Sequence, residues 1–211
     1  MIYALAKKML SPLLRLHFHL TRTRKKAGHR GLSFPDRVLL EDVILPYLAV
    51  QPHLKDVLFI GCEWYTAWYR NVYFKDKNFT TIEIDPVLAK FGSPQAHITD
   101  GIQHLDKYMQ PAGFDLIIYN GVFGWGVNSR KDAEDAFRQI RKALRPGGLL
   151  LFGWDDIPER KPFDVLTESE ELKHFAAYHF PPLNTAAHRV TEDGFRHTYN
   201  FYALPVQRET L

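Results

Sequence analysis

The sequence contains a single cysteine, Cys62, among its 211 residues. One cysteine cannot form an internal disulfide, and the ten histidines do not cluster at the spacing that ligands of one metal ion require. We therefore predict no bound metal. Because chains without disulfides are typical of reducing compartments, we expect the protein to be cytoplasmic.

Three signatures of catalytic chemistry are also missing from the chain. The sequence has no Gly-x-x-x-x-Gly-Lys-Ser/Thr phosphate loop and no His-Glu-x-x-His pair of zinc ligands. It also lacks a serine set between glycines in the pattern of a nucleophile elbow. These absences argue against a P-loop nucleotide hydrolase, a zinc peptidase of that type and an α/β-hydrolase.

Acidic residues are absent from the first 35 positions, which contain eight Lys or Arg residues. The rest of the chain holds the other 19 basic residues and all 24 acidic ones, so its formal net charge is −5, although the whole chain carries +3. The N-terminal segment is therefore a basic extension of a mildly acidic body. We predict a helical arm over residues 1–32 and a single domain over residues 33–211.

The arm lacks an uninterrupted apolar run. Lys7, Lys8, Pro12 and Arg15 break its first 20 residues, so the sequence predicts neither a transmembrane segment nor a secretory signal. Two interpretations stay open. The arm is either an amphipathic helix that caps the domain, which we favour, or a helix whose residues 1–31 bind nucleic acid or an anionic membrane surface, to which the protein would be peripheral.

A unit of strand, turn, helix and strand is present over residues 56–85. The apolar run at residues 57–60 ends at Gly61, an aromatic-rich segment of helical length follows, and a β-rich run over residues 79–84 closes the unit. Glu83, near the end of that run, lies 22 residues after Gly61. This is close to the spacing at which an acid can bind the ribose hydroxyls of a nucleotide.

Strands and helices continue to alternate along the chain. The further expected strands are residues 96–99, 114–119 and 149–154. One helix is expected to begin near Ser33, and four others are expected at residues 87–91, 102–108, 132–144 and 169–177. A turn signal at residues 192–194 predicts a C-terminal antiparallel hairpin. This order predicts an α/β fold with a doubly wound, mostly parallel sheet, which binds its ligand at the carboxyl ends of the strands.

Several segments resemble the Rossmann-like (class I) S-adenosylmethionine-dependent methyltransferases. FDLIIYNGVFGWG, from Phe114, and DAEDAFRQIRKALRPGGLLLFGW, from Asp132, are similar to the family's fourth strand, the following helix and the Leu-x-Pro-Gly-Gly turn into its fifth strand. IEIDP and ITDGIQHL are similar to the end of the second strand and the loop after the third. The resemblance implies a seven-stranded, mostly parallel sheet with an antiparallel C-terminal strand.

The resemblance also implies the cofactor, S-adenosylmethionine, and a set of residues around it. Glu83 would bind the ribose hydroxyls, Asp100 the adenine amino group, and the turn at Gly61 and Cys62 the methionine end. Asn120 would lie between the cofactor and the acceptor. The full set expected around the cofactor is Gly61, Cys62, Glu63, Glu83, Ile84, Asp100, Gly101 and Asn120.

The glycine-rich turn departs from the family pattern of acid-x-Gly-x-Gly-x-Gly. Phe59 stands at the position of the acid, and Glu63 and Tyr65 stand where later glycines are expected. Glycine lets the backbone approach a ligand closely, so its loss leaves open an alternative in which the chain is a non-catalytic relative that binds a partner through its basic arm. We predict that Glu63 replaces the missing carboxylate at the methionine end. Its alternative role is to cap a helix that begins at Trp64.

The expected activity is transfer of a methyl group from S-adenosylmethionine to a small-molecule acceptor that the sequence does not identify. Phe123 and Trp125 lie in a glycine-rich loop and, with Trp154, are candidates for a lid or an acceptor wall. The alternative is that these aromatic side chains fill space under the loop. An NAD-dependent enzyme competes on the same fold, but Glu63 would repel the pyrophosphate of that cofactor.

Histidine is the commonest general base, and four histidines could serve as one. They are His97, His104, His188 and His197. We interpret each of them as a surface histidine or as one satisfied by a neighbouring hydrogen bond. No residue is therefore predicted to be catalytic.

Overall fold

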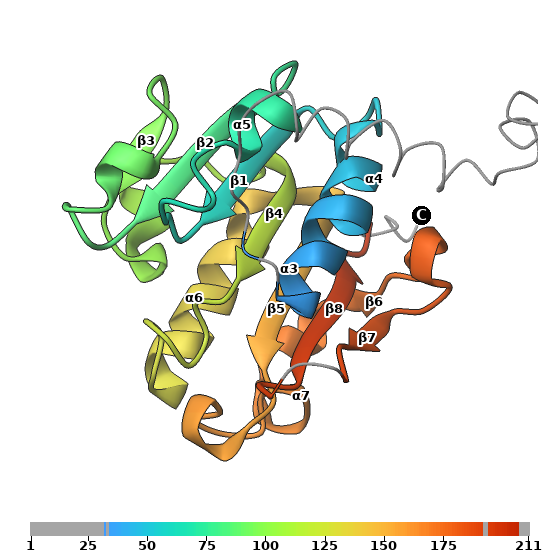
Figure 1. Cartoon of the computed structure of the whole chain (residues 1–211). Coiled ribbons are helices and arrows are strands. Elements are labelled where there is room, and N and C mark those ends of the chain that lie inside the picture. The colour runs from blue at the N-terminus through green and yellow to red at the C-terminus, as the bar shows by residue number, and fades with distance from the viewer. Residues whose placement is uncertain (1–31, 33, 192–193, 207–211) are drawn as a thin grey trace, which may run out of the picture.

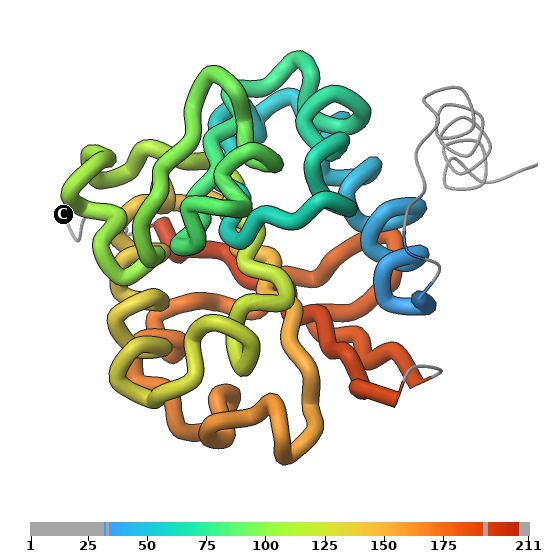
Figure 2. The backbone as a smooth tube through the Cα atoms, turned by 60° about the vertical axis from the view of Figure 1, so that its left-hand side comes forward, coloured from blue at the N-terminus to red at the C-terminus, as the bar shows by residue number. Residues whose placement is uncertain are grey.

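The computed structural model describes residues 32, 34–191 and 194–206. The predicted basic arm lies outside the described residues apart from Leu32. In the described part, a twisted sheet separates helical segments on its two faces (Figures 1 and 2).

The described strands form one eight-stranded sheet in the order β3-β2-β1-β4-β5-β8-β6, and β7 also pairs with β8. They are β1 (Asp56–Ile60), β2 (Asn78–Glu83), β3 (His97–Thr99), β4 (Phe114–Asn120), β5 (Leu144–Asp155), β6 (Ala176–Ala177), β7 (Ala187–Arg189) and β8 (His197–Ala203). Strands β1 to β5 pair in parallel, whereas β8 runs antiparallel to β5, β6 and β7. The predicted sheet is confirmed, with one strand more than the seven expected.

The helical segments are short except for α6 (Arg130–Ala143). The others are α3 (Pro35–Leu39), α4 (Leu45–Ala49), α5 (Tyr69–Val72), α7 (Val165–Glu168), the π-helical turn η1 (Leu40–Ile44) and the 3₁₀ turns η2 (Ala89–Phe91), η3 (Ile102–Lys107), η4 (Pro158–Arg160), η5 (Leu172–His174) and η6 (Pro181–Leu183). The Ser129 side chain caps α6 by accepting a hydrogen bond from the Asp132 N–H at 3.1 Å. Because α3, η1 and α4 follow one another without a break, residues 35–49 are helical throughout, as the sequence predicts for the segment after Ser33.

Alternate residues of the central strands face opposite layers of the fold. In β4, Ile117 packs in the cluster that contains Phe137 of α6, whereas Ile118 packs in the cluster that contains Leu40 of η1. All four side chains are fully buried. Burial of a side chain of this size stabilises the folded state by about 1.5–3 kcal/mol. Because both faces of β4 are buried, its sequence is a continuous apolar run.

The helix predicted after Gly61 is wrong in its extent. Residues 64–68 form turns, and only the four residues of α5 are helical. The Thr66 hydroxyl accepts a hydrogen bond from the Glu63 N–H at 3.0 Å and donates one to the Glu63 carbonyl at 2.9 Å, which favours a local turn over a helical start. The aromatic side chains of this segment still pack on the sheet, as Tyr69 does against Phe59 with ring centroids 5.6 Å apart.

The helix predicted over residues 169–177 is also wrong. Only η5 is helical there, and Ala176 and Ala177 form β6, which pairs with β8. Strand pairing with a neighbour distant in sequence has therefore overridden the local preference for a helix. The predicted hairpin is confirmed, because β7 pairs antiparallel with β8.

Candidate cofactor-binding site

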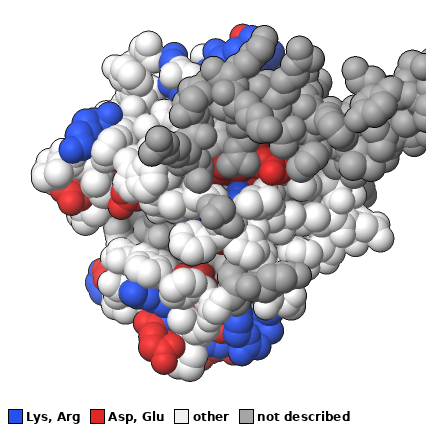
Figure 3. All heavy atoms as spheres, in the orientation of Figure 1, with Lys and Arg blue, Asp and Glu red and all other residues white. Residues whose placement is uncertain are grey.

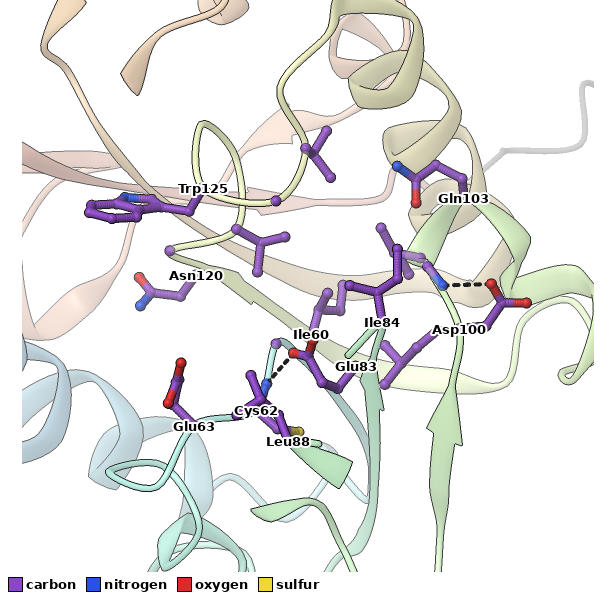
Figure 4. A pocket seen from close by; sticks show the side chains of 18 residues that line it. Ile60, Cys62, Glu63, Glu83, Ile84, Leu88, Asp100, Gln103, Asn120 and Trp125 are labelled. Atoms are coloured by element: carbon purple, nitrogen blue, oxygen red, sulfur yellow. Dashed lines mark hydrogen bonds between the residues drawn. The ribbon is translucent and has the colours of Figure 1, made fainter. Parts of the chain in front are cut away.

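A cavity of about 260 Å³ lies at the carboxyl ends of β1, β2 and β4 (Figure 4). The chain continues from β1 to β2 on one side, while β4 pairs with β1 on the other, so the cavity sits where the strand order reverses. Its lining residues are Ile60, Gly61, Cys62, Glu63, Ile82, Glu83, Ile84, Leu88, Asp100, Gly101, Ile102, Gln103, Asn120, Gly121, Val122, Trp125, Gly126 and Val127. All eight residues predicted around the cofactor line this cavity.

Glycines from several turns keep the cavity open. Gly61 has a φ of +86°, and a Cβ atom there would lie 2.7 Å from Cγ2 of Val122. Gly121, with a φ of +69°, and Gly126 also line the cavity, in the loop that follows β4. The close approach of backbone that a glycine-rich first turn provides is therefore shared between β1 and β4 in this chain.

The carboxylate of Glu83 connects the ends of two neighbouring strands. It accepts a 2.8 Å hydrogen bond from the Cys62 N–H at the end of β1, and another of 2.8 Å from the N–H of Asp85. Each carboxylate oxygen holds one backbone donor and retains further acceptor capacity. Figure 4 shows Glu83 in the middle of the lining, between the ends marked by Glu63 and Asp100.

The Cys62 thiol is not poised for chemistry. The side chain is buried, and burial, followed by the charge of Glu83, raises the thiol pKa to about 12. A thiol is nucleophilic as the thiolate, so at neutral pH Cys62 contributes its backbone and its volume.

The side chain of Glu63 reaches toward the cavity and does not cap a helix. Its backbone atoms bond to Thr66, but the carboxylate accepts no hydrogen bond from a described residue. Figure 4 shows this carboxylate at the same end of the cavity as Asn120. The geometry favours the predicted ligand-facing role over the capping alternative, although contact with a cofactor stays a prediction.

Asp100 lies at the other end of the cavity but directs its carboxylate away from it (Figure 4). The carboxylate accepts hydrogen bonds from the Gly101 N–H at 2.7 Å and from the Tyr108 hydroxyl at 2.9 Å, and it lies 2.7 Å from Nδ1 of His104. The bond to His104 is the largest cause that lowers the pKa of Asp100 to about 2. The neighbouring Gln103, which we did not predict, also lines this end.

A chain of buried polar side chains backs the end of the cavity near Asn120. Nε2 of His197 lies 3.0 Å from Oδ1 of Asn120, and Nδ1 of His197 lies 2.6 Å from Oδ1 of Asp155. The indole N–H of Trp125 donates a 2.8 Å hydrogen bond to the other oxygen of Asp155. Burial by itself would raise the pKa of Asp155, but the bond and charge of His197, the Trp125 bond and the charge of Arg37 outweigh it and lower that pKa.

The three aromatic residues predicted at the acceptor have different positions. Phe123 is fully buried against Phe152 and Phe163, and Trp154 is buried with its indole N–H bonded to Asn200 at 2.9 Å. Neither lines the cavity, so the prediction that they form an acceptor wall is corrected to the space-filling alternative. Trp125 lines the cavity, but the Arg160 guanidinium covers its ring at 3.4 Å from the centroid.

Three of the four histidines that could serve as a general base bond to a neighbouring side chain, and one of these three lies beside the cavity. His97 bonds to Thr81 and His104 to Asp100, whereas His197 is brought to Asn120. The alternation of β8 places His197 on the same face as the buried Tyr199, and this period of two is the signal that could have identified it.

Arg37 was not predicted at the site. It lies in α3, and its Nη2 is 3.6 Å from the position of a Cβ atom at Gly121. Nothing in the sequence near residue 37 indicates this neighbour, because the approach depends on how α3 packs over the end of β4.

The described part of the chain contains neither a metal-binding cluster nor a membrane-spanning helix. Among the described residues, no group of three or more His, Cys, Asp or Glu side chains is placed to hold a metal ion. Within the same ranges, no helix has both the length and the apolar composition that crossing a membrane requires.

Comparison with known protein families gives a match over part of the chain. Residues 58–152 match the family model described as a methyltransferase domain. No curated protein sequence matches the chain.

Solved structures share the fold at low sequence identity. The N-methyltransferase NodS from Bradyrhizobium japonicum WM9, in complex with S-adenosyl-L-homocysteine, has a TM-score of 0.60 and 16% identity over 84% of this chain and 96% of its own. A TehB-like methyltransferase from Corynebacterium glutamicum has a TM-score of 0.54 and 16% identity over 90% and 97%. The 1,6-didemethyltoxoflavin-N1-methyltransferase from Burkholderia thailandensis has a TM-score of 0.53 and 14% identity over 93% and 92%.

Proposed function

We propose that the chain is a class I S-adenosylmethionine-dependent methyltransferase, which binds S-adenosylmethionine in the cavity at its strand ends and transfers the methyl group to a small-molecule acceptor. The observation that carries the proposal is the position of Glu83. Its carboxylate faces the middle of the cavity and is fixed by two backbone donors, from Cys62 and Asp85. A fixed carboxylate at this point suits two vicinal ribose hydroxyls.

The residues present fit the cofactor along the length of the cavity. Ile84 and Ile102 give the adenine end apolar side chains, and Gln103 adds an amide. Glu63 offers an unoccupied carboxylate at the other end, where the methionine ammonium would lie. The volume of about 260 Å³ is close to the lower limit of roughly 300 Å³ at which ligand pockets are usually found.

When bound, S-adenosylmethionine supplies a methyl group on a sulfonium, which is already activated for displacement. The chain therefore needs to align the acceptor and to exclude water. The loop 121–127 serves both purposes at the acceptor end. It is held tightly, because the N–H groups of Trp125, Gly126 and Val127 all donate to the carbonyl of Val122, at 2.8–3.1 Å.

A small-molecule acceptor is supported by the charge distribution of the described body. On the face shown in Figure 3, Lys and Arg side chains alternate with Asp and Glu side chains in small groups. The described body also contains ion pairs of Lys131 with Asp135 and of Lys173 with Glu170. This face offers no broad basic patch among the described residues, which a nucleic-acid acceptor would require. The cavity and its free carboxylate favour an enzyme over the non-catalytic alternative.

Titration calorimetry with S-adenosylmethionine, S-adenosylhomocysteine and NAD tests the proposal. We expect saturable binding of the first two ligands with one site per chain and no measurable binding of NAD. Binding of NAD alone would replace the proposal with the dinucleotide alternative, and binding of none of the three would contradict it.

A further inference from the structure

We propose that Arg37 and Asn120 form an oxyanion-binding subsite at the acceptor end of the cavity, so that the methyl acceptor is a small molecule with a carboxylate or another oxyanion close to the methylated atom. This inference rests on the proposed function. It adds a substrate class and two residues that position the acceptor.

The first observation is an unused donor. Asn120 is 6% exposed and lines the cavity, and its Nδ2 has no hydrogen-bond partner among the described residues. Buried amide groups are nearly always paired, so an unpaired one beside a cavity indicates a ligand that accepts from it. Because the amide donates two hydrogens and accepts none through nitrogen, that ligand atom is an oxygen or nitrogen with a free lone pair.

The second observation is that neighbouring residues fix which end of the amide faces the cavity. Oδ1 of Asn120 lies 3.0 Å from Nε2 of His197 and accepts from it when His197 carries a proton on both ring nitrogens, because the proton on Nδ1 is donated to Asp155 at 2.6 Å. Trp125 holds the remaining oxygen of Asp155. Each member of this chain comes from a different strand end or loop, so Asn120 is oriented by the sheet rather than by its own rotamer preference.

The third observation is a buried cation beside the same wall. The side chain of Arg37 is 11% exposed, and its ion pair with Asp36 is long at 3.7 Å from Nε to Oδ2. Arg37 also bonds to the Tyr69 side chain, and its charge acts on Asp155. Its guanidinium carbon lies 4.7 Å from the centroid of the Tyr65 ring, and Nη2 lies 3.6 Å from the position of a Cβ atom at Gly121. Gly121 lines the cavity and has no side chain, so the guanidinium lies directly behind the cavity wall, although Arg37 is not itself a lining residue. A guanidinium and an amide donor together match a carboxylate or oxyanion.

The fourth consideration is the order of binding. Glu63 lies at the same end of the cavity and would repel an anion in the absence of the cofactor. The ammonium of the cofactor would neutralise that carboxylate. The subsite therefore accepts its anion after the cofactor is bound, and this order is itself a measurable property.

The test uses benzoate and its neutral isostere benzamide as probes, titrated into the full-length protein by calorimetry at constant ionic strength. Binding of S-adenosylhomocysteine is measured first. We expect benzoate to bind at least tenfold more tightly to the S-adenosylhomocysteine complex than to the free protein, and at least tenfold more tightly than benzamide. Arg37→Gln is expected to lower benzoate affinity at least tenfold while S-adenosylhomocysteine affinity stays within threefold.

Two further variants keep the result interpretable. If Arg37→Gln fails to fold, Asn120→Asp replaces the donor by an acceptor of the same shape and is expected to lower benzoate affinity at least tenfold. Arg70→Gln is the control, because Arg70 and Lys90 line a separate cavity of about 130 Å³ that could hold an anion nonspecifically. This control should leave benzoate affinity unchanged.

Specific results would overturn the subsite. These are equal affinity for benzoate and benzamide, no binding of benzoate at tens of millimolar, benzoate affinity unchanged by Arg37→Gln, or loss of benzoate binding in Arg70→Gln. If S-adenosylhomocysteine binds and the probes fail in one of these ways, the subsite alone is rejected. If S-adenosylhomocysteine does not bind, the proposed function is rejected in the first titration, together with the inference that depends on it.

Discussion

A Cβ atom added at Gly153 would lie 1.7 Å from Oδ1 of Asn120. The two residues are partners in adjacent strands, Gly153 in β5 and Asn120 in β4. The same Cβ atom would lie 2.9 Å from Nε2 of His197. The absence of a side chain in β5 therefore creates the space in which Asn120 and His197 meet.

This relationship gives the first prediction, on Gly153→Ala. The added methyl group must displace the side chain of Asn120, because real Cβ contacts do not occur at such a distance. We expect the free energy of unfolding to fall by about 1–3 kcal/mol, as is usual when a packed core is overfilled. Chemical denaturation measures this change.

Gly126→Ala is the matched control for that prediction. Gly126 lines the same cavity, but a Cβ atom there would have its nearest contact at 3.7 Å, an ordinary distance. The free energy of unfolding of this variant should stay within about 0.5 kcal/mol of the parent. Equal destabilisation by the two substitutions would contradict the special role of the space at Gly153.

The second prediction concerns Glu63→Gln, which removes a charge and keeps the shape. If the carboxylate holds the ammonium of the cofactor, affinity for S-adenosylmethionine falls at least tenfold, or about 1.4 kcal/mol. Calorimetry measures the change, and Glu159→Gln, at an exposed site outside the cavity lining, serves as control. An affinity within twofold of the parent would show that Glu63 has no part in holding the cofactor.

The third prediction follows from the pKa of Asp100, which is about 2 against an ordinary value of 3.8. Because the folded pKa is the lower one, the ionised carboxylate favours the folded state. Its contribution to stability is complete above about pH 4 and is lost as the pH falls toward 2. Asp100→Asn should therefore melt below the parent at pH 6 and approach it at pH 2.

Thermal denaturation across this pH range measures the effect of Asp100→Asn. Asp76→Asn is a suitable control, because the Asp76 side chain is 80% exposed and its ion pair with Lys75 is 3.6 Å long. A melting difference that stays constant from pH 6 to pH 2 would contradict the assigned cause. The same variant should bind S-adenosylhomocysteine normally if the Asp100 carboxylate stays turned away from the cavity.

Much of the fold could be predicted from the sequence because buried parallel strands are continuous apolar runs, as in residues 114–119. The position of Glu83 could be predicted from its distance along the chain to Gly61, since both lie in one βαβ unit. The contact of His197 with Asn120 could not be predicted, because it depends on β8 packing beside β5. Arg37 was missed for a similar reason, since its neighbour Gly121 is set by the packing of α3.

The predicted helices show the same limit. The stripe in residues 132–144 predicted α6 well, because an amphipathic period over several turns reflects one buried face. The aromatic residues after Gly61 are buried as expected, yet most of that segment is not helical. Packing of large rings on the sheet determines its path more strongly than helical propensity does.

The fourth prediction concerns the basic arm, residues 1–31, which lie outside the described residues. We expect a chain without them to bind S-adenosylhomocysteine within threefold of the parent, because the cavity is built from residues 60–127. If the arm binds an anionic surface, the full chain should sediment with anionic vesicles or bind RNA at low salt, and high salt should release it. A full chain that binds neither would leave the arm as a structural cap of the domain.

The fifth prediction tests the central claim, that Glu83 holds the ribose of S-adenosylmethionine in this cavity. The measurement is calorimetric titration of S-adenosylhomocysteine into the parent, Glu83→Ala and Asp85→Ala, with the fold of each checked by its melting temperature. Loss of two hydrogen bonds to a charged group corresponds to about 3 kcal/mol or more, so Glu83→Ala should bind at least roughly 100-fold more weakly. Asp85→Ala, whose side chain does not line the cavity, should bind within threefold of the parent. A folded Glu83→Ala protein that binds S-adenosylhomocysteine as tightly as the parent would contradict the account.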